Sequence, residues 1–223
     1  MKLINIKTAT AQTAIKLLGI VFPPIAIAEA SGEYLNNISN YILLEKIKRF
    51  VEAQDSDFEE WLKASCDYQK DSSKYEATVK MLIYVIESIN DDMKIDVYAN
   101  LMRAYKSKLL EKSLFLKLSS MLPAMFYDDL LFLKNYVDKE IKEIFEDDNF
   151  FSVAYANLLN YGLVYCNTEG LYIDTRGSKT FRITIPGLEM VRCGIDYDNY
   201  DKYRNVKVVY EVHESDHIQV ETI

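Results

Sequence analysis

Hydrophobic residues recur at spacings of three and four over much of the first two thirds of the chain. Such spacing places one apolar stripe on a helix, because an α-helix completes a turn in about 3.6 residues. The pattern returns at 79–86, 95–105, 109–122 and 130–137, so a helical domain is predicted over residues 33–146. Its first stripe consists of Leu35, Ile38, Ile42, Leu43, Ile47, Phe50 and Val51.

Polar residues between the stripes indicate where the helices begin and end. Ser56 is followed three residues later by Glu59, a capping-box pattern that predicts a helix start. Asp128 and Asp129 stand at the head of a further stripe, where carboxylates favour the positive end of a helix. An acidic run over residues 138–149 then ends the helical pattern, so a domain boundary is predicted at 146–149.

The pattern changes after residue 149. Residues 150–161 predict one helix, which Gly162 ends in a left-handed conformation. Alternating residues at 163–166 and 180–185 predict two strands, with a short strand at 171–174 between them and a short helix at 188–193. The predicted fold class is therefore mainly α, a helical body followed by a small winged-helix-like α+β module at 150–195. Residues 196–223 form an acidic tail with a predicted strand at 206–212.

Residues 1–32 form a separate apolar N-terminal segment. Its apolar run covers residues 17–28 and is interrupted by Pro23 and Pro24. Because a membrane-spanning helix needs about 20 apolar residues, this run is too short to span. Polar residues precede it, which is not typical of a signal peptide. Two interpretations stay open: peripheral membrane contact, or a helix and loop folded against the body.

Charge changes the interpretation of the winged-helix-like module. The chain has 34 acidic and 26 basic residues, a net charge of −8, which disfavours a nucleic-acid partner. In DNA-binding winged helices the helix before the hairpin contacts bases, yet residues 150–161 contain no Lys or Arg. Arg176, Lys179 and Arg182 in the hairpin are the candidate phosphate contacts. Protein contact is the favoured role, and DNA binding is the alternative.

The sequence contains no recognisable catalytic or cofactor-binding constellation. Cys66, Cys166 and Cys193 lack metal-ligand spacing, and their odd number fits a reducing, cytoplasmic compartment. Each is interpreted as a small buried hydrophobe. His213 and His217 would share one face of a helix as metal ligands, but the surrounding sequence is β-like and favours a solvated tail. We therefore expect a non-enzymatic protein with no cofactor and no metal.

Short segments in a particular order resemble a known family. They are GEYL at 32–35, LLEKIKRF at 43–50, NLLNYGLV at 157–164 and ITIPGLEMVRC at 183–193. Their order resembles the Abi-alpha family, small bacterial and prophage proteins linked by name to abortive phage infection. The resemblance covers residues 19–195. It implies an intracellular accessory or effector protein of phage–host conflict and carries over no catalytic residues.

These observations lead to one expected function and one alternative. The expected function is a non-enzymatic defence or phage-encoded interaction protein that acts through protein contacts. A protein partner, self-association into a homo-oligomer, and peripheral membrane contact through residues 1–32 are its expected interactions. The alternative is a winged-helix transcription regulator that uses Arg176, Lys179 and Arg182 on DNA phosphates. A hydrolase or nuclease has no residue set to support it.

Overall fold

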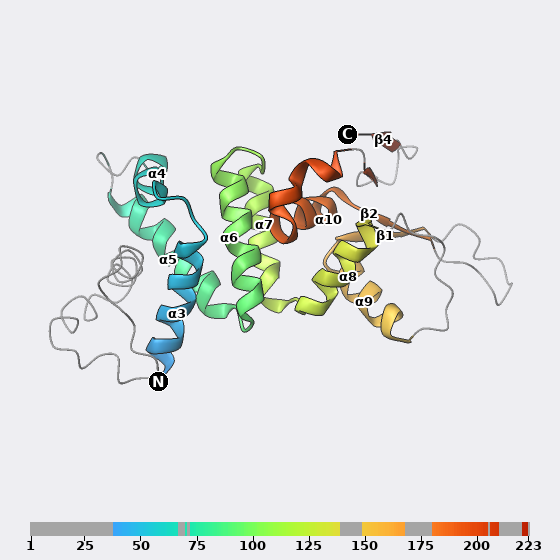
Figure 1. Ribbon diagram of the computed structural model, residues 1–223, viewed down its shortest axis with the longest axis horizontal. Coiled ribbons are helices and arrows are strands. Elements are labelled where there is room, and N and C mark those ends of the chain that lie inside the picture. The colour runs from blue at the N-terminus through green and yellow to red at the C-terminus, as the bar shows by residue number, and fades with distance from the viewer. Residues whose placement is uncertain are drawn as a thin grey trace, which may run out of the picture. The chain divides into compact units, whose positions relative to one another are not determined.

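A computed structural model describes residues 38–66, 70, 72–138, 149–167, 180–204, 206–209 and 220–222. The described chain is mainly helical, with small two-stranded antiparallel sheets in its C-terminal part (Figure 1). Its contacts cluster into two units, residues 1–106 and residues 107–223. The boundary predicted at 146–149 falls within the second unit, largely outside the described residues, and stays a prediction. The apolar segment 1–32 also lies outside the described residues.

Helices α3 to α6 form the described part of the first unit. Helix α3 packs on both α5 and α6. Four residues of the predicted stripe, Leu43, Ile47, Phe50 and Val51, are buried, whereas the prediction is wrong for Ile42, which is 49% exposed. The Phe50 ring lies 5.9 Å from that of Phe58 and 5.2 Å from that of Tyr98, so aromatic contacts join three helices. The helices are α3 Ile38–Glu52, α4 Phe58–Ser65, α5 Ser72–Ser88 and α6 Asp92–Lys106.

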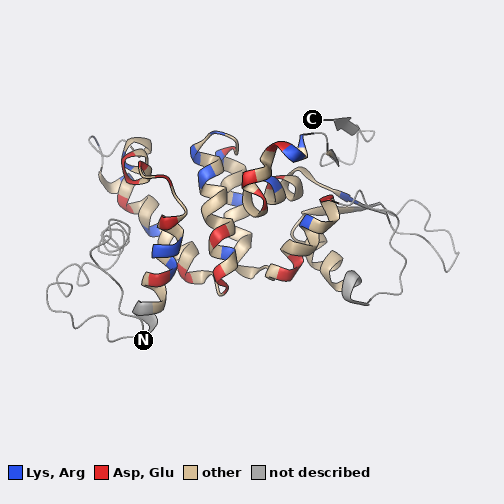
Figure 2. Cartoon of the chain, in the orientation of Figure 1, with Lys and Arg blue, Asp and Glu red and all other residues tan. Residues whose placement is uncertain are grey.

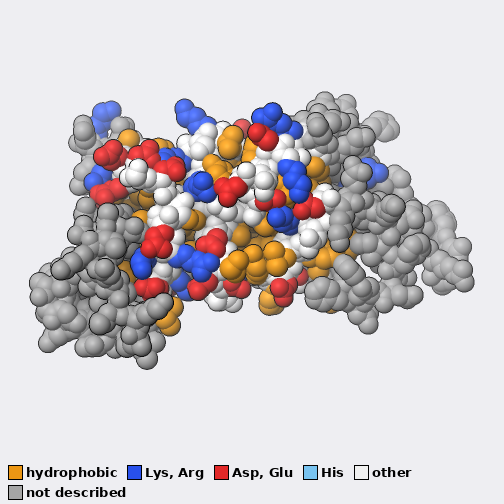
Figure 3. Space-filling model, in the orientation of Figure 1, with side chains coloured by type: hydrophobic (Ala, Val, Ile, Leu, Met, Phe, Trp, Pro, Cys, Tyr) orange, Lys and Arg blue, Asp and Glu red, His pale blue; other side chains and the backbone are white. Residues whose placement is uncertain are grey.

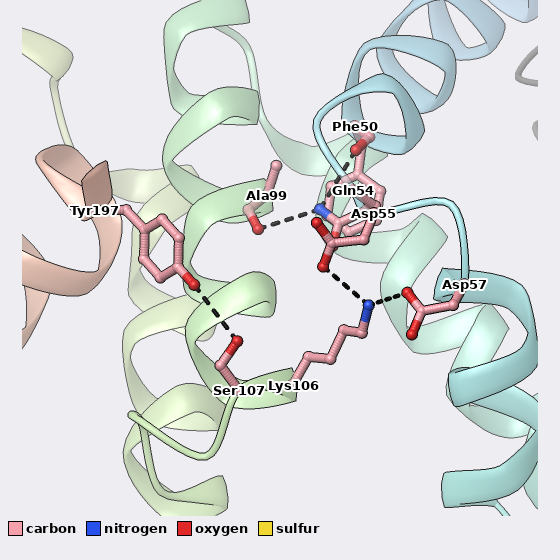
Figure 4. Close-up of polar contacts among 8 residues, drawn as sticks. All are labelled: Phe50, Gln54, Asp55, Asp57, Ala99, Lys106, Ser107 and Tyr197. Carbon is pink, nitrogen blue, oxygen red and sulfur yellow. Dashed lines mark hydrogen bonds and ion pairs between the residues drawn. The ribbon is translucent and has the colours of Figure 1, made fainter.

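The end of α6 is tied to the loop between α3 and α4 (Figure 4). Lys106 pairs with Asp55 at 2.9 Å and also with Asp57. In the same loop the Gln54 amide donates to the Ala99 carbonyl at 3.1 Å. The capping box predicted at Ser56 is wrong, because α4 begins one residue later than that box requires. The N-cap of α4 is Asp57, whose carboxylate binds Lys106 and makes no capping bond.

The second unit contains the remaining helices and all the described strands. Helix α8 packs on α9 and on a π-helical segment, η3. The predicted strands at 163–166 and 180–185 are confirmed as β1 and β2, whereas the strand predicted at 171–174 lies outside the described residues. The elements are α7 Lys112–Met121, η2 Leu122–Ala124, α8 Tyr127–Asp138, α9 Asn149–Asn160, β1 Val164–Asn167, β2 Thr180–Ile183, α10 Ile185–Glu189, η3 Met190–Ile195, η4 Tyr197–Tyr203, β3 Lys207–Val209 and β4 Val220–Thr222.

The β1–β2 pair has one buried and one exposed face. Val164 lies opposite Ile183, and both side chains are buried. The next pair along the strands, Tyr165 and Arg182, is exposed. Successive residues of a strand point to opposite faces, so this register fixes which side chains reach solvent. In the region predicted as an acidic tail, residues 197–203 are helical, and β3 pairs antiparallel with β4.

Thr184 joins the end of α9, the first strand and the start of α10. Its hydroxyl donates to the Gly162 carbonyl at 2.7 Å and accepts from the Gly187 N–H at 3.1 Å. Its own N–H donates to the Leu163 carbonyl at 3.2 Å. Gly162 has φ of 66°, as predicted for a left-handed helix end. A Cβ on Gly187 would lie 1.9 Å from the Leu163 carbonyl oxygen, so only glycine fits there.

Replacing these two glycines with alanine should have unequal effects. Gly162→Ala meets no atom within 4 Å and should cost about 1 kcal/mol of unfolding free energy, from its left-handed φ alone. Gly187→Ala forces backbone to move and should cost ~3 kcal/mol. Urea unfolding of both variants checks the order. Equal losses would contradict the close approach of α10 to Leu163.

Candidate functional site

Helix α9 presents an uncharged, largely apolar surface to solvent. We define the α9 face as Val153, Ala156, Leu159 and Asn160, which are all exposed, Val153 by 60%. They share one side of the helix because residues three and four apart are neighbours. None of the 12 residues of α9 is charged, and in Figure 2 the described part of its ribbon is tan, without the blue or red of charged residues. The residues turned inward are Ala154, Tyr155 and Leu158.

Aromatic packing against α8 fixes the rotation of α9 about its axis. The Tyr155 ring lies 5.0 Å from the ring of Phe132 and 5.8 Å from that of Tyr136, edge to face in both cases. Burial raises the pKa of Tyr155 well above its ordinary value, which fits a ring packed between α9 and α8. With Tyr155 turned toward α8, Val153 and Ala156 are turned away from it.

Two polar contacts fix the end of α9 against the start of α8. The Asn157 amide donates to the Asp129 carboxylate at 2.9 Å, and the Tyr161 hydroxyl donates to the Ala124 carbonyl at 3.0 Å. Burial raises the pKa of Asp129, and the hydrogen bond from Asn157 opposes this rise. The second contact places the end of α9 beside the segment that carries Phe126, whose side chain is 69% exposed.

Of the three candidate phosphate contacts, only Arg182 lies in the described part of the chain. Arg176 and Lys179 lie outside it, so whether the three gather into one basic surface stays a prediction. Arg182 is exposed on β2, directly opposite Tyr165 on β1. Opposite residues of an antiparallel pair share a face, so an aromatic ring and a guanidinium stand together there. Burial raises the pKa of Tyr136 to about 12, and the charge of Arg182 works against this rise.

A buried polar cluster that the sequence did not suggest lies where α10 continues into η3. The Arg192 guanidinium donates to the Glu189 carboxylate at 2.8 Å, and its Cζ lies 4.7 Å from the centre of the Tyr200 ring. The Cys193 thiol donates to the same carboxylate at 3.1 Å. The signal available in the sequence was the spacing of Glu189, Arg192 and Cys193 at three and four residues on one helix.

This cluster is built to hold its members in place. Cys193 is fully buried, as predicted for a small hydrophobic residue. Burial raises the pKa of the Cys193 thiol, and the neighbouring Glu189 carboxylate raises it further. A thiol that keeps its proton is a poor nucleophile, because the thiolate is the reactive form. The arrangement therefore favours a structural role for Cys193.

A second polar cluster joins η4 to α8. The Tyr203 hydroxyl lies 2.5 Å from Asp196 and 3.1 Å from Asp138, and it donates to these carboxylates. A lysine balances each carboxylate: Lys134 lies 3.2 Å from Asp196, and Lys202 lies 2.7 Å from Asp138. Because Lys134 and Asp138 belong to α8, the cluster stabilises the helix that supports α9.

The electrostatics of Asp196 give this cluster a pH dependence. Burial raises its pKa, but hydrogen bonds from Tyr203, Asn199 and Lys134 outweigh burial and hold the pKa below its usual value. A carboxyl group with a lowered pKa stabilises the folded state above its unfolded pKa of about 3.9. The stabilisation is lost as pH falls through the lower pKa of the folded state.

The described residues hold no group of three or more His, Cys, Asp and Glu side chains suited to a metal ion. His213 and His217, the pair considered as ligands from the sequence, lie outside the described ranges, so this candidate is untested. In the part of the chain that the structure covers, no helix combines the length and apolar character needed to cross a membrane.

Comparisons with known proteins add no relative to this picture. No family model matches the chain, and neither a curated protein nor a solved structure matches it.

Asp196→Asn should remove much of the cluster's stabilisation at neutral pH. We expect ~1–3 kcal/mol less unfolding free energy at pH 7, because buried donors lose a charged partner. From about pH 5 to pH 3 the wild type should lose stability more steeply than the variant. Urea unfolding across this range measures both effects. The exposed Asp201, changed to Asn, is the control, and equal pH slopes for wild type and Asp196→Asn would contradict the assignment.

Proposed function

We propose that the chain is a non-enzymatic protein of phage–host conflict whose C-terminal, winged-helix-like module binds a protein rather than DNA. One observation carries the choice of partner: the helix before the hairpin, α9, exposes an uncharged and largely apolar face. A helix in this position enters the major groove in DNA-binding winged helices. Here it offers solvent Val153, Ala156 and Leu159, which suit a protein surface better than phosphates.

The distribution of charge supports the same choice. Protein–DNA affinity comes largely from Lys and Arg side chains that neutralise phosphates. On the face of the molecule in Figure 3, acidic and basic side chains are intermixed over the described helices, with hydrophobic side chains between them. Together with a net charge of −8, this mixture disfavours the long-range attraction that brings a protein to DNA.

The phage–host part of the proposal rests on the resemblance to the Abi-alpha family. Two of the segments that carry it, 157–164 and 183–193, run from α9 into β1 and from β2 into η3. They contain Gly162, Thr184 and Gly187, the residues of the junction beside α9. The resemblance therefore falls on residues that build the module and position the α9 face.

The proposal also includes a cytoplasmic location and peripheral membrane contact through residues 1–32. The apolar run at 17–28 supports this contact, and its length fits the surface of a membrane better than a passage across it.

A phage challenge tests the proposal and the role of the α9 face together. Cells that carry the intact gene should differ from empty-vector cells in culture density or phage yield. Val153→Glu should abolish the difference, because a charge in an apolar contact must be desolvated. Tyr84→Glu is the matched control: Tyr84 is 70% exposed on α5 of the first unit, and the change should have no effect. A deletion of residues 1–30 tests the membrane contact.

Two results would contradict the proposal. If the intact gene changes nothing across a broad phage panel, the phage–host part is wrong. If Val153→Glu acts like the wild type, and circular dichroism shows that it is folded, the α9 face does not bind the partner.

DNA binding is kept as a second candidate because Arg182 and Tyr165 are exposed together on the hairpin. An arginine beside an aromatic ring is a common nucleic-acid contact. We expect no binding of a fluorescent duplex by the wild type at ~50 mM salt, as measured by anisotropy. Tight, salt-sensitive binding that Arg182→Glu weakens, while Arg204→Glu does not, would favour the regulator instead.

A further inference from the structure

One residue of the apolar stripe on α3 stays exposed near the start of the helix. The side chain of Ile42 is 49% exposed, although the sequence pattern places it inside. It lies on the same side of α3 as Lys46, four residues later. Lys46 Nζ donates to the backbone carbonyls of Glu87 and Ile89, at the end of α5. Ile42 therefore lies one helical turn beyond the place where α3 contacts the turn between α5 and α6.

The same side of α3 also passes a second exposed apolar side chain and two carboxylates. Arg49 lies two turns after Ile42 on this side. Its Nη2 lies 3.8 Å from the Met93 sulfur, and its Nη1 lies 3.7 Å from the Asp92 carboxylate. Met93 is 44% exposed, and Asp92 and Glu87 are exposed too. We define the Ile42 patch as Ile42, Met93, Glu87 and Asp92.

The N-terminal segment 1–32 is basic, whereas the rest of the chain is acidic. The segment contains Lys2, Lys7 and Lys16 and a single acidic residue, Glu29, so it carries a charge of +2. Because the whole chain carries −8, the remaining residues carry −10. Opposite charges attract, so the acidic body draws this segment toward itself. The exposed carboxylates beside α3 offer its lysines a partner.

The chain connects this segment directly to α3. Residues 29–37 link the apolar run at 17–28 to the helix, and these nine residues span at most ~30 Å. Helix α3 is ~22 Å long, so the run reaches any point along it. Gly32 within the link lets the chain reverse its direction. A tether this short gives the run an effective concentration on the order of millimolar at the patch, which a separate protein seldom reaches.

We propose that the apolar run at 17–28 folds back within the same chain and covers the Ile42 patch. Burying Ile42 and Met93 removes apolar surface of both the patch and the run from water. Lys16 directly precedes the run and is the lysine that meets the carboxylates of the patch. The run thereby covers the one residue of the α3 stripe that the described structure leaves exposed.

The fold-back regulates the membrane contact of the proposed function, and this step rests on that contact. The same apolar residues cannot lie on α3 and in a lipid surface at once. Anionic lipids attract lysines within about a Debye length, ~8 Å at physiological salt. A membrane rich in such lipids therefore competes with the carboxylates of the patch and draws the run away, whereas an uncharged lipid surface leaves it on α3.

Hydrogen exchange of the full chain, measured by mass spectrometry, tests the fold-back. Backbone amides at 17–28 should exchange about 10-fold more slowly in the wild type than in Ile42→Lys, because the lysine removes an apolar contact and repels the basic segment. Met93→Lys should have the same effect. Met81→Lys on α5 is the matched control, since Met81 is 37% exposed and points about 120° away from Glu87 around the helix. Circular dichroism checks that the three variants are folded.

Co-sedimentation of the full chain with vesicles tests the release. Vesicles of phosphatidylcholine with about 30% phosphatidylserine should bind Ile42→Lys at least ~3-fold better than the wild type, because the patch no longer holds the run. Met81→Lys adds the same charge to the body and should bind like the wild type. Vesicles of phosphatidylcholine alone should bind the wild type less than the anionic vesicles do.

Two results overturn the fold-back. Equal exchange at 17–28 in the wild type and in both patch variants shows that the run does not cover the patch. An equal loss of protection in Met81→Lys shows that added charge alone releases the run. If the patch variants lose protection while vesicle binding does not rise, the run covers the patch and the membrane contact of the proposed function is wrong. If both measurements are as expected and no phage response exists, this inference stands without the phage–host role.

Discussion

The close approach of α10 to the Leu163 carbonyl is the constraint on which the packing around β1 and β2 depends. It requires glycine at 187, because a Cβ there would lie 1.9 Å from the carbonyl oxygen. Thr184 then binds the end of α9 and the start of α10 with one hydroxyl, as acceptor from one N–H and donor to one carbonyl. This short stretch of backbone joins the end of α9 to β1 and to the start of α10.

Two buried carboxylates of the second unit are neutralised by ion pairs and hydrogen bonds within small clusters of side chains. Glu189 is bound by Arg192 and by the Cys193 thiol, and Asp196 is bound by Lys134 and Tyr203. Burying a lone carboxylate is costly, so such groups are stable only when each member has a partner. These clusters hold the π-helix η3 and α8 in a fixed arrangement. The charges that pair in these groups are therefore not available for recognition.

The sequence predicted what depends on near neighbours and missed what depends on distant ones. The stripe of α3, with Ile47 and Phe50 buried, and the left-handed Gly162 follow from local spacing and local backbone preference. The predicted cap at Ser56 was wrong because the N-cap of α4 is Asp57, and the carboxylate of Asp57 binds Lys106, 49 residues away, instead of capping the helix. The absence of basic residues before the hairpin was visible in the sequence. Which residues of α9 reach solvent was not, because the packing of Tyr155 decides it.

The contrast between α9 and the rest of the chain has a physical consequence for partner choice. With 27% of its residues charged, the chain has few stretches of 12 that carry no charge. A neutral helix on a surface weakens solubility, and it binds no phosphate or acidic peptide by attraction. Binding at this helix is driven by the desolvation of apolar side chains. This effect acts only at contact distance and does not depend on the sign of the partner's charge. Recognition at α9 therefore depends on the shape of the partner's apolar surface.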